Sequence, residues 1–315
     1  MSFTNLLTIA IPCFERKEYF MTALESALNQ TVGCSVIVVD NCSSHDYFEK
    51  VCKEKGVIYF KNETNIGLFP NINRCYTLAQ SEYVKILDDD DFLSPMYVES
   101  FLSAKELHPN IDVFYSDFIK FSSKGELAIE QIIPFGYMEN GSKIVEYGIK
   151  YGLGFPYMTC AVRKTKAQLD FDVNESGGGY DYFWVYSNED KLSFFGERSK
   201  LHHYRIHNAK ASHKENEMVV NFLTAPFIND TVLLPKIREH KLKKKISNNT
   251  FWGLIYLKSF GDKKELEKLI NSESKFGQYF NVKLNENILL KIVFIIPKRI
   301  VRIFYMVSKK VGFTR

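Results

Sequence analysis

The sequence has no cysteine pattern that predicts a disulfide framework or a zinc site. Its six cysteines are scattered, without a CxxC pair and without histidines at zinc-ligand spacing: Cys13, Cys34, Cys42, Cys52, Cys75 and Cys160. Reduced thiols in a cytosolic protein are therefore expected.

An excess of charge of one sign is also missing. The chain has 41 basic and 37 acidic residues and a formal net charge of +4, which argues against a dedicated nucleic-acid-binding protein. Residues 1–19 lack the basic start and the long apolar segment of a secretory leader, so the first strand is expected close to the N-terminus. With 315 residues, of which 45% are hydrophobic, the chain can bury one large core, or a core and a smaller accessory unit.

Apolar, strand-like runs alternate with amphipathic helical runs through the first third of the chain. This alternation is typical of βαβ units and predicts an α/β fold with a mostly parallel central sheet flanked by helices. The predicted strands are residues 6–12, 35–40, 57–60 and 83–87, with 113–118 and 155–163 as further strands. The predicted helices are residues 18–29 and 70–79 and a segment opened by Ser94 as its capping residue.

Two of the predicted strands end in acidic residues. Asp40 closes the second strand, and the run from Asp88 to Asp91 follows the fourth. In a parallel sheet with right-handed crossovers the strand C-termini lie at one edge, so these acids are expected to face the same cleft. Adjacent carboxylates repel one another, which raises their proton affinity or requires a shared cation. A metal site and a solvated turn both remain open, and Asp40 alone also fits a turn-forming residue.

Four segments resemble, in order and spacing, the nucleotide-sugar-binding half of family 2 glycosyltransferases, which have a GT-A fold. They are IAIPCFERKEYFMTALESALNQT, VIVVDNCSSHD, NETNIGLFPNINRC and YVKILDDDDFL. The resemblance is strong over residues 5–100 and continues more weakly to about residue 213. It implies a GT-A catalytic domain at 1–215, with the nucleotide-sugar-binding half at 1–95 and the acceptor-binding half at 96–215.

The resemblance implies donor-binding roles for residues near the strand ends. Pro12 and the turn Phe14, Glu15 and Arg16 are similar to the family's Pro-x-Tyr-Asn segment, which approaches the nucleotide. Asp40 matches the acid that accepts a hydrogen bond from the uracil ring, as an ionised carboxylate can only accept. The other donor-side residues that the resemblance implies are Asn65, Gly67, Asn73, Asp88, Asp89 and Arg205.

The acidic run is similar to the family's Asp-x-Asp-Asp motif in the register Asp88-x-Asp90-Asp91. The resemblance implies that Asp88 and Asp90 bind Mn²⁺ or Mg²⁺, since hard cations prefer oxygen ligands and bridge carboxylates to a diphosphate. For Asp89 a solvated side chain remains an alternative.

KLHHYRIHNAKAS, at residues 200–212, resembles the Tyr-Arg-x-His segment that closes this domain in the family. Arg205 and His207 lie two residues apart on one side of an extended stretch, so both are expected to reach the phosphates or the metal. His207 is the third implied metal ligand, and a structural role is equally open. His202 and His203 are expected at an edge or on the surface.

Residues 171–190, FDVNESGGGYDYFWVYSNED, place three glycines before an aromatic segment. The glycines fit an acceptor-binding loop or an ordinary turn. YDYFW is similar to the family's Glu-Asp-x-x-Phe/Leu-Trp segment, whose aspartate is the general base, which implies that Asp181 is the catalytic base. The alternative is an acid favoured by the dipole of a helix N-terminus.

The C-terminal region, residues 216–315, is expected to be helical and basic. From Asn287 to Arg315 there are seven basic residues and no acid. Lys291 and Pro297 interrupt its apolar run, which is too short for a span of about 20 residues. The segment 287–315 is expected to lie on an anionic membrane surface, with packing on the protein core or on a partner as the alternative.

Together with these features, the resemblance implies an inverting, metal-dependent glycosyltransferase of the bacterial surface-polysaccharide type. It is expected to move a hexosyl or N-acetylhexosaminyl group from a UDP-sugar to a glycan or an undecaprenyl-linked glycan, at the cytoplasmic face of the inner membrane. One alternative is a sugar-phosphate nucleotidyltransferase, which needs a glycine-rich phosphate loop after the first strand, whereas PCFERKEY has no glycine. The other is a non-catalytic nucleotide- or glycan-binding protein.

Overall fold

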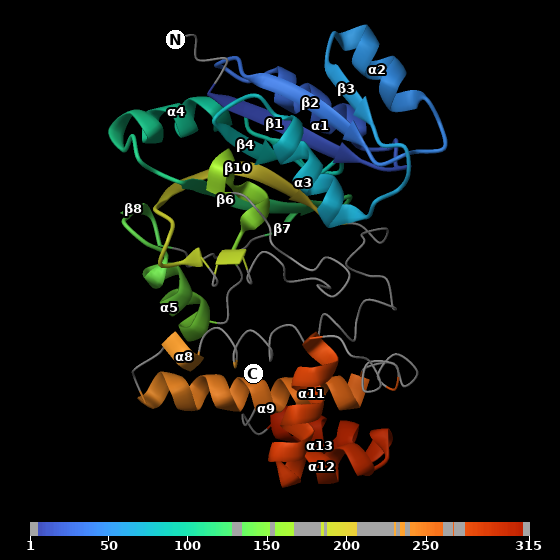
Figure 1. Cartoon of the computed structure of the whole chain (residues 1–315), viewed down its shortest axis with the longest axis vertical. Coiled ribbons are helices and arrows are strands. Elements are labelled where there is room, and N and C mark those ends of the chain that lie inside the picture. Colours follow the sequence, from blue (N-terminus) through green and yellow to red (C-terminus); the bar gives the residue numbers. More distant parts are fainter. Residues whose placement is uncertain are drawn as a thin grey trace. The chain divides into compact units, whose positions relative to one another are not determined.

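The computed structural model (Figure 1) describes a set of segments that covers most of the N-terminal two thirds and the C-terminal helices. They are residues 6–127, 134–151, 155–166, 184–185, 188–206, 230, 234–236, 240–260, 267 and 275–310. The chain divides into two compact units, Met1–Asp170 with Asn188–His207, and Phe171–Ser187 with Asn208–Arg315. The predicted domain boundary between 215 and 216 lies outside the described residues.

Four parallel strands form one half of the central sheet, in the order β3-β2-β1-β4. They are β1 (Leu7–Cys13), β2 (Ser35–Asp40), β3 (Ile58–Lys61) and β4 (Tyr83–Ile86). Cys13 pairs with Asp40, and Asp40 pairs with Lys61. The C-terminal ends of three strands therefore lie side by side, as expected for a parallel sheet that collects ligands at one edge.

The other half of the sheet continues in the order β9-β6-β10-β5. These strands are β9 (Ala161–Arg163), β6 (Val113–Ser122), β10 (Phe194–Arg205) and β5 (Phe92–Leu93), and β7 (Gly125–Leu127) and β8 (Gly136–Met138) add to β6 and β10. β6 and β10 are parallel, whereas β9 is antiparallel to β4 and β6, and β5 is antiparallel to β10. The short β5, which follows the acidic run, therefore pairs this part of the chain with β10.

Helices cover both faces of the sheet (Figure 1). They are α1 (Phe20–Leu28), α2 (Tyr47–Lys55), α3 (Leu68–Leu78) and α4 (Tyr97–Leu107). α1, α2 and α4 share a buried core with the odd-numbered residues of β1, including Ile9 and Ile11. Ile72 and Cys75 of α3 are buried outside that core, which places α3 on the opposite face, because successive strand residues point to opposite sides. α5 (Ser142–Tyr151) and two short 3₁₀ turns, η2 (Tyr157–Thr159) and η3 (Lys164–Lys166), complete the described helices of this unit.

The predicted α/β class with a sheet flanked by helices and a C-terminal helical extension is confirmed. The expected strand at 155–163 is only partly correct, since η2 occupies its centre and β9 its end. The Thr159 hydroxyl donates to the carbonyl of Pro156 at 2.9 Å, which stabilises the turn in place of a strand. α4 begins at Tyr97 rather than beside Ser94. α2 was not predicted, and Gly56 ends it in the left-handed region at φ 69°.

The described part of the second unit is helical. Its helices are α8 (Leu234–Lys236), α9 (His240–Phe260), α11 (Lys275–Glu286), α12 (Ile288–Ile295) and α13 (Lys298–Lys310). Leu254, Phe280, Leu290 and Tyr305 bring α9, α11, α12 and α13 together in one buried cluster. Among the described residues, no helix combines the length and the apolarity needed to cross a membrane.

Gly196 of β10 lies where the sheet leaves no room for a side chain. A Cβ at this position would stand 2.5 Å from the Pro134 carbonyl oxygen and 2.6 Å from the Tyr115 hydroxyl. We predict that Gly196→Ala lowers the free energy of unfolding by about 1–3 kcal/mol, because backbone must move to relieve the overlap. Gly33→Ala is the control, since its Cβ would meet no atom within 4 Å. Urea unfolding of both variants measures the difference, and equal stability would contradict the packing described here.

Candidate functional site

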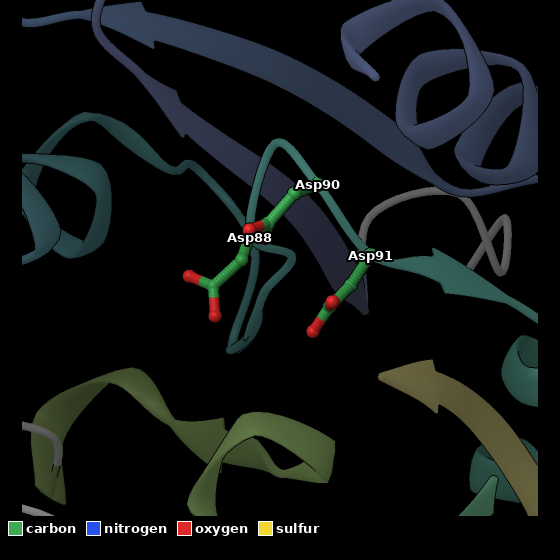
Figure 2. A group of neighbouring side chains, drawn as sticks. All are labelled: Asp88, Asp90 and Asp91. Carbon is green, nitrogen blue, oxygen red and sulfur yellow. The ribbon is translucent and has the colours of Figure 1, made fainter. Parts of the chain in front are cut away.

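The acidic run forms the loop between β4 and β5 (Figure 2). Oxygen atoms of Asp88, Asp90 and Asp91 all lie within 4.8 Å of one another. Asp89, Asp90 and Asp91 are buried, whereas Asp88 is half-buried. Buried carboxylates at this spacing repel strongly, so the loop depends on the positive groups and hydrogen-bond donors around it.

Arg16, in the loop after β1, is one such group. Its guanidinium pairs with the carboxylates of Asp89 and Asp90, and the distance from Nη1 to Asp90 Oδ2 is 3.1 Å. Burial raises the pKa of the Asp89 carboxyl above its ordinary value, and the charge of Arg16 opposes that rise. Asp89 therefore has a protein partner, and the solvated side chain considered for it is not what the structure shows.

Asp91 holds β10 against the acidic loop. Its Oδ2 lies 2.9 Å from Nε2 of His202, and its Oδ1 accepts a hydrogen bond of 2.8 Å from the backbone N–H of Arg205. Both side chains of the Asp91–His202 pair are fully buried, so the expectation of His202 at an edge or on the surface is wrong. The register of β10 shifts between Lys200 and His202, and this bulge breaks the alternation on which a sequence-based assignment depends.

Arg205 also belongs to the acidic loop. Its Nε donates to the backbone carbonyl of Asp90 at 2.7 Å. The guanidinium carbon lies 4.2 Å from the ring centre of Tyr19 and 4.5 Å from that of Phe121. Contact with two aromatic rings fixes the plane of the guanidinium beside the carboxylates.

A lysine that the sequence reading did not single out lies beneath the loop. Lys85, in β4, is fully buried, and its ammonium donates to the backbone carbonyls of Ile86 and Met158. Burial lowers the pKa of Lys85 to about 8, and the charges of Asp88 and Asp91 act in the opposite direction. A buried cation thus supports the acidic loop from inside the sheet.

Asp40 connects the ends of β1 and β2. Its carboxylate accepts hydrogen bonds from the Ser43 N–H and hydroxyl, at 2.9 and 2.6 Å, and from the Tyr59 hydroxyl at 2.7 Å. The Ser43 hydroxyl oxygen in turn accepts a hydrogen bond of 2.9 Å from the backbone N–H of Glu15. Because Arg16 follows Glu15 in the sequence, these contacts connect Asp40 to the loop that reaches the acidic run.

Glu15 also connects the loop after β1 to the turn after β2. Its carboxylate accepts the N–H and the hydroxyl of Ser44 at 2.8 and 2.9 Å, and these bonds lower the pKa of Glu15. The backbone of Glu15 has φ 59°, a left-handed conformation that is uncommon outside glycine. Phe14, the residue before it, is exposed, and Pro12 is buried within β1.

Four asparagines form a hydrogen-bonded network beside Asp40. Asn41 donates to Asn65 at 2.8 Å, and Asn62 donates to Asn41 at 2.9 Å and to Asn71 at 2.8 Å. The Asn65 oxygen also accepts the N–H of Gly67 at 2.9 Å. The resemblance implied a donor-binding role for Asn65 but not for Asn41, Asn62 or Asn71, because amide pairs between separate segments leave no periodic signal in the sequence.

Gly67 and Asn73 lie before and within α3. Gly67 precedes α3 with φ 88° and ψ 169°, a conformation that only glycine adopts readily. Asn73 lies within α3, where its carbonyl accepts the Thr77 hydroxyl at 3.1 Å. Two predicted residues, Asp181 and His207, lie outside the described residues.

The donor set of the acidic loop fits a hard divalent cation. Asp88, Asp90 and Asp91 offer carboxylate oxygens, the ligands that Mg²⁺ and Mn²⁺ prefer. The structure brings Asp88 and Asp90, the pair that the resemblance implies, together with Asp91, which also accepts bonds from His202 and Arg205.

The N-terminal half of the chain is similar in sequence to known proteins. Residues 8–167 match the sequence profile of the family described as Glycosyl transferase family 2. An uncharacterized glycosyltransferase of Methanocaldococcus jannaschii is 27% identical over 202 residues, which cover 62% of this chain and 68% of that protein. The minor teichoic acid biosynthesis protein GgaB of Bacillus subtilis is 31% identical over 121 residues, 36% of this chain and 13% of that protein.

Solved structures match over nearly the whole chain. The crystal structure of S. aureus TarS 1–349 in complex with UDP-GlcNAc has a TM-score of 0.64 and 16% sequence identity, and it covers 98% of this chain and 92% of that chain. At this identity the likeness shows the fold.

The Asp91–His202 contact gives a direct test of the site. We predict that His202→Phe lowers the free energy of unfolding by about 3 kcal/mol, because it leaves a buried carboxylate without its side-chain partner. His203→Phe is the control, since the His203 ring stacks on Phe92 at 4.2 Å and phenylalanine preserves that contact. Urea unfolding compares the two variants. Equal losses would contradict a specific role for the Asp91–His202 pair.

Proposed function

The chain belongs to glycosyl transferase family 2, and on that premise we propose that it is an inverting, metal-dependent enzyme that transfers a sugar from a UDP-sugar to a hydroxyl group of a glycan. The observation that carries the proposal is the acidic loop, in which three carboxylates lie within 4.8 Å of one another beside Arg16 and Arg205. A nucleotidyltransferase remains disfavoured, because the loop after β1 has no glycine.

The nucleotide is proposed to bind along the ends of β1 and β2. Phe14 is exposed there and offers a ring face. The Asp40 carboxylate is buried and accepts three hydrogen bonds, and its remaining acceptor site, of about four, is proposed to take a uracil N–H. The loop from Asn65 to Gly67 is held by the asparagine network next to Asp40. The UDP-GlcNAc complex of TarS, a protein of the same fold, supports a UDP-sugar as the donor.

The acidic loop is proposed to hold the diphosphate end of the donor. Asp88 and Asp90 would bind Mn²⁺ or Mg²⁺, with His207 as a further ligand. A bound divalent cation stabilises the negative charge that develops on the leaving nucleoside diphosphate. Arg16 and Arg205 lie beside these carboxylates, where guanidinium groups can donate hydrogen bonds to phosphate oxygens. Asp89 keeps Arg16 at this position.

Asp181 is proposed as the catalytic base. Its carboxylate would accept the proton of the acceptor hydroxyl while that oxygen forms a bond to the anomeric carbon. The bond from that carbon to the diphosphate oxygen breaks, and its electron pair leaves with UDP. Attack from the opposite face inverts the anomeric centre, so a UDP-α-sugar gives a β-linked product.

The acceptor is proposed to be a growing surface glycan, linked to undecaprenyl or a similar lipid at the cytoplasmic face of the inner membrane. GgaB, whose name assigns it to teichoic acid biosynthesis, supports an acceptor of the cell surface. The basic, apolar segment 287–315 supports a location at the membrane surface, because a lipid-linked acceptor is presented there.

Removal of one proposed ligand tests the metal site. We predict that Asp90→Asn weakens Mn²⁺ binding about tenfold or more, because a neutral amide replaces a charged ligand. Titration calorimetry with Mn²⁺ alone and with Mn²⁺ plus UDP measures the effect. Asp112→Asn is the control, since this half-buried acid pairs with Arg163 at 3.0 Å in another part of the same unit. Unchanged binding by Asp90→Asn would remove Asp90 from the metal site.

The base assignment has a test of its own. We predict that Asp181→Asn lowers kcat by about a hundredfold or more, because an amide cannot accept the proton. The affinity for UDP should stay within about twofold, since Asp181 is proposed to act on the acceptor side. Asp190→Asn, an exposed acid in the same segment, should retain activity. Full activity of Asp181→Asn would refute the assignment.

A further inference from the structure

The helices α12 and α13 expose an unusual amount of aliphatic side chain. On α12, Ile288 is 72% and Ile295 is 83% exposed. On α13, Ile303 is 66% and Ile300 is 57% exposed. Isolated apolar side chains on a surface need no explanation, but exposed ones on two consecutive helices indicate an interaction surface.

These side chains follow the period of the helix. Ile288, Ile292 and Ile295 lie at positions i, i+4 and i+7 of α12, and they therefore share one face. Ile300, Ile303 and Val307 share one face of α13 in the same way, whereas Val301 and Tyr305 face the buried core of the unit. Each helix thus has one face in the buried core and a second face of exposed aliphatic side chains.

The charged side chains of the segment are all basic. Residues 287–310 contain no acid, and Lys291, Lys298, Arg299 and Arg302 on these helices are exposed. The adjacent α11 carries both signs of charge, and its Lys283 pairs with Glu286 at 3.6 Å and with Asp230 at 2.8 Å. The basic charge of α12 and α13 therefore accompanies the aliphatic faces rather than a balanced, solvated surface.

We propose that α12 and α13 dock on an anionic phospholipid surface, with the aliphatic faces in the acyl boundary and the basic side chains at the lipid phosphates. An apolar face with basic residues and no acid matches the chemistry of such a surface. A second copy of the chain is a poorer partner, because a self-complementary contact of this surface would bring its own basic residues together. Short helices of 8 and 13 residues suit a position in the interface.

This inference deepens the proposed function, on which it rests for the lipid-linked acceptor. Docking through α12 and α13 would keep the enzyme at the surface where such an acceptor is held, and so raise the effective concentration of acceptor. The lipid partner is identified by its phosphate charge and its acyl chains, independently of the sugar transferred.

The test uses the full chain and vesicles of phosphatidylcholine, with or without phosphatidylglycerol, in a sedimentation assay. We expect binding to the anionic vesicles and at least about tenfold weaker binding by Ile303→Asp, because a charge is costly in the acyl boundary. Val282→Asp is the matched control, since Val282 is 50% exposed on α11, outside the proposed surface, and should bind as the wild type does. Added salt should weaken binding, since the basic residues contribute to it.

Three results would overturn the proposal. The first is that the wild type does not bind anionic vesicles. The second is that Ile303→Asp and Val282→Asp weaken vesicle binding equally. The third is that the wild type forms a dimer, that Ile303→Asp dissociates this dimer, and that neither the dimer nor the monomer binds vesicles. UDP binding, measured by calorimetry in solution, separates this proposal from the proposed function. Vesicle binding by a chain that binds no UDP would leave the docking surface in place and refute the UDP-sugar donor of the proposed function.

Discussion

The structure depends on the neutralisation of four adjacent carboxyl groups at the end of β4. Three of them are buried, where unpaired negative charges are costly. Arg16 approaches from the loop after β1, and Lys85 lies beneath in β4. From β10, His202 and Arg205 complete the set. Residues as far as 115 positions along the chain from the acidic loop therefore converge on it, and their convergence positions the groups proposed to bind the donor.

The four acids have different environments, which gives them different roles. Asp89 pairs with Arg16, and Asp91 fastens β10 through His202 and the Arg205 N–H. Asp88 is half-buried, and Asp90 contacts Arg16 at 3.1 Å. A guanidinium at this distance can support the carboxylate before a cation arrives and can donate to a phosphate afterwards. In the proposed function, the run of acids is therefore a metal-binding pair supported by two structural neighbours.

Much of the N-terminal half was predictable from the sequence because its signals are local. The apolar runs that became β1, β2 and β4, and the acids at the ends of β2 and β4, follow directly from strand periodicity and the geometry of parallel sheets. The contact of Asp91 with His202 was not predictable, since 111 residues separate them and a bulge in β10 interrupts the alternation of buried and exposed positions. In the sequence, Lys85 is an ordinary polar residue of a strand. Its burial depends on a contact that the sequence does not show, the hydrogen bond from its ammonium to the Met158 carbonyl in η2.

We propose that Asp88 and Asp90 hold a divalent cation against the diphosphate of a nucleotide donor. The most direct measurement is a crystal structure of the chain with UDP and Mn²⁺, in which anomalous scattering locates the ion. We expect an anomalous peak between these two carboxylates and the phosphate oxygens, with UDP along the ends of β1 and β2. UDP bound elsewhere, or bound there with Mn²⁺ away from the acidic loop, would contradict it.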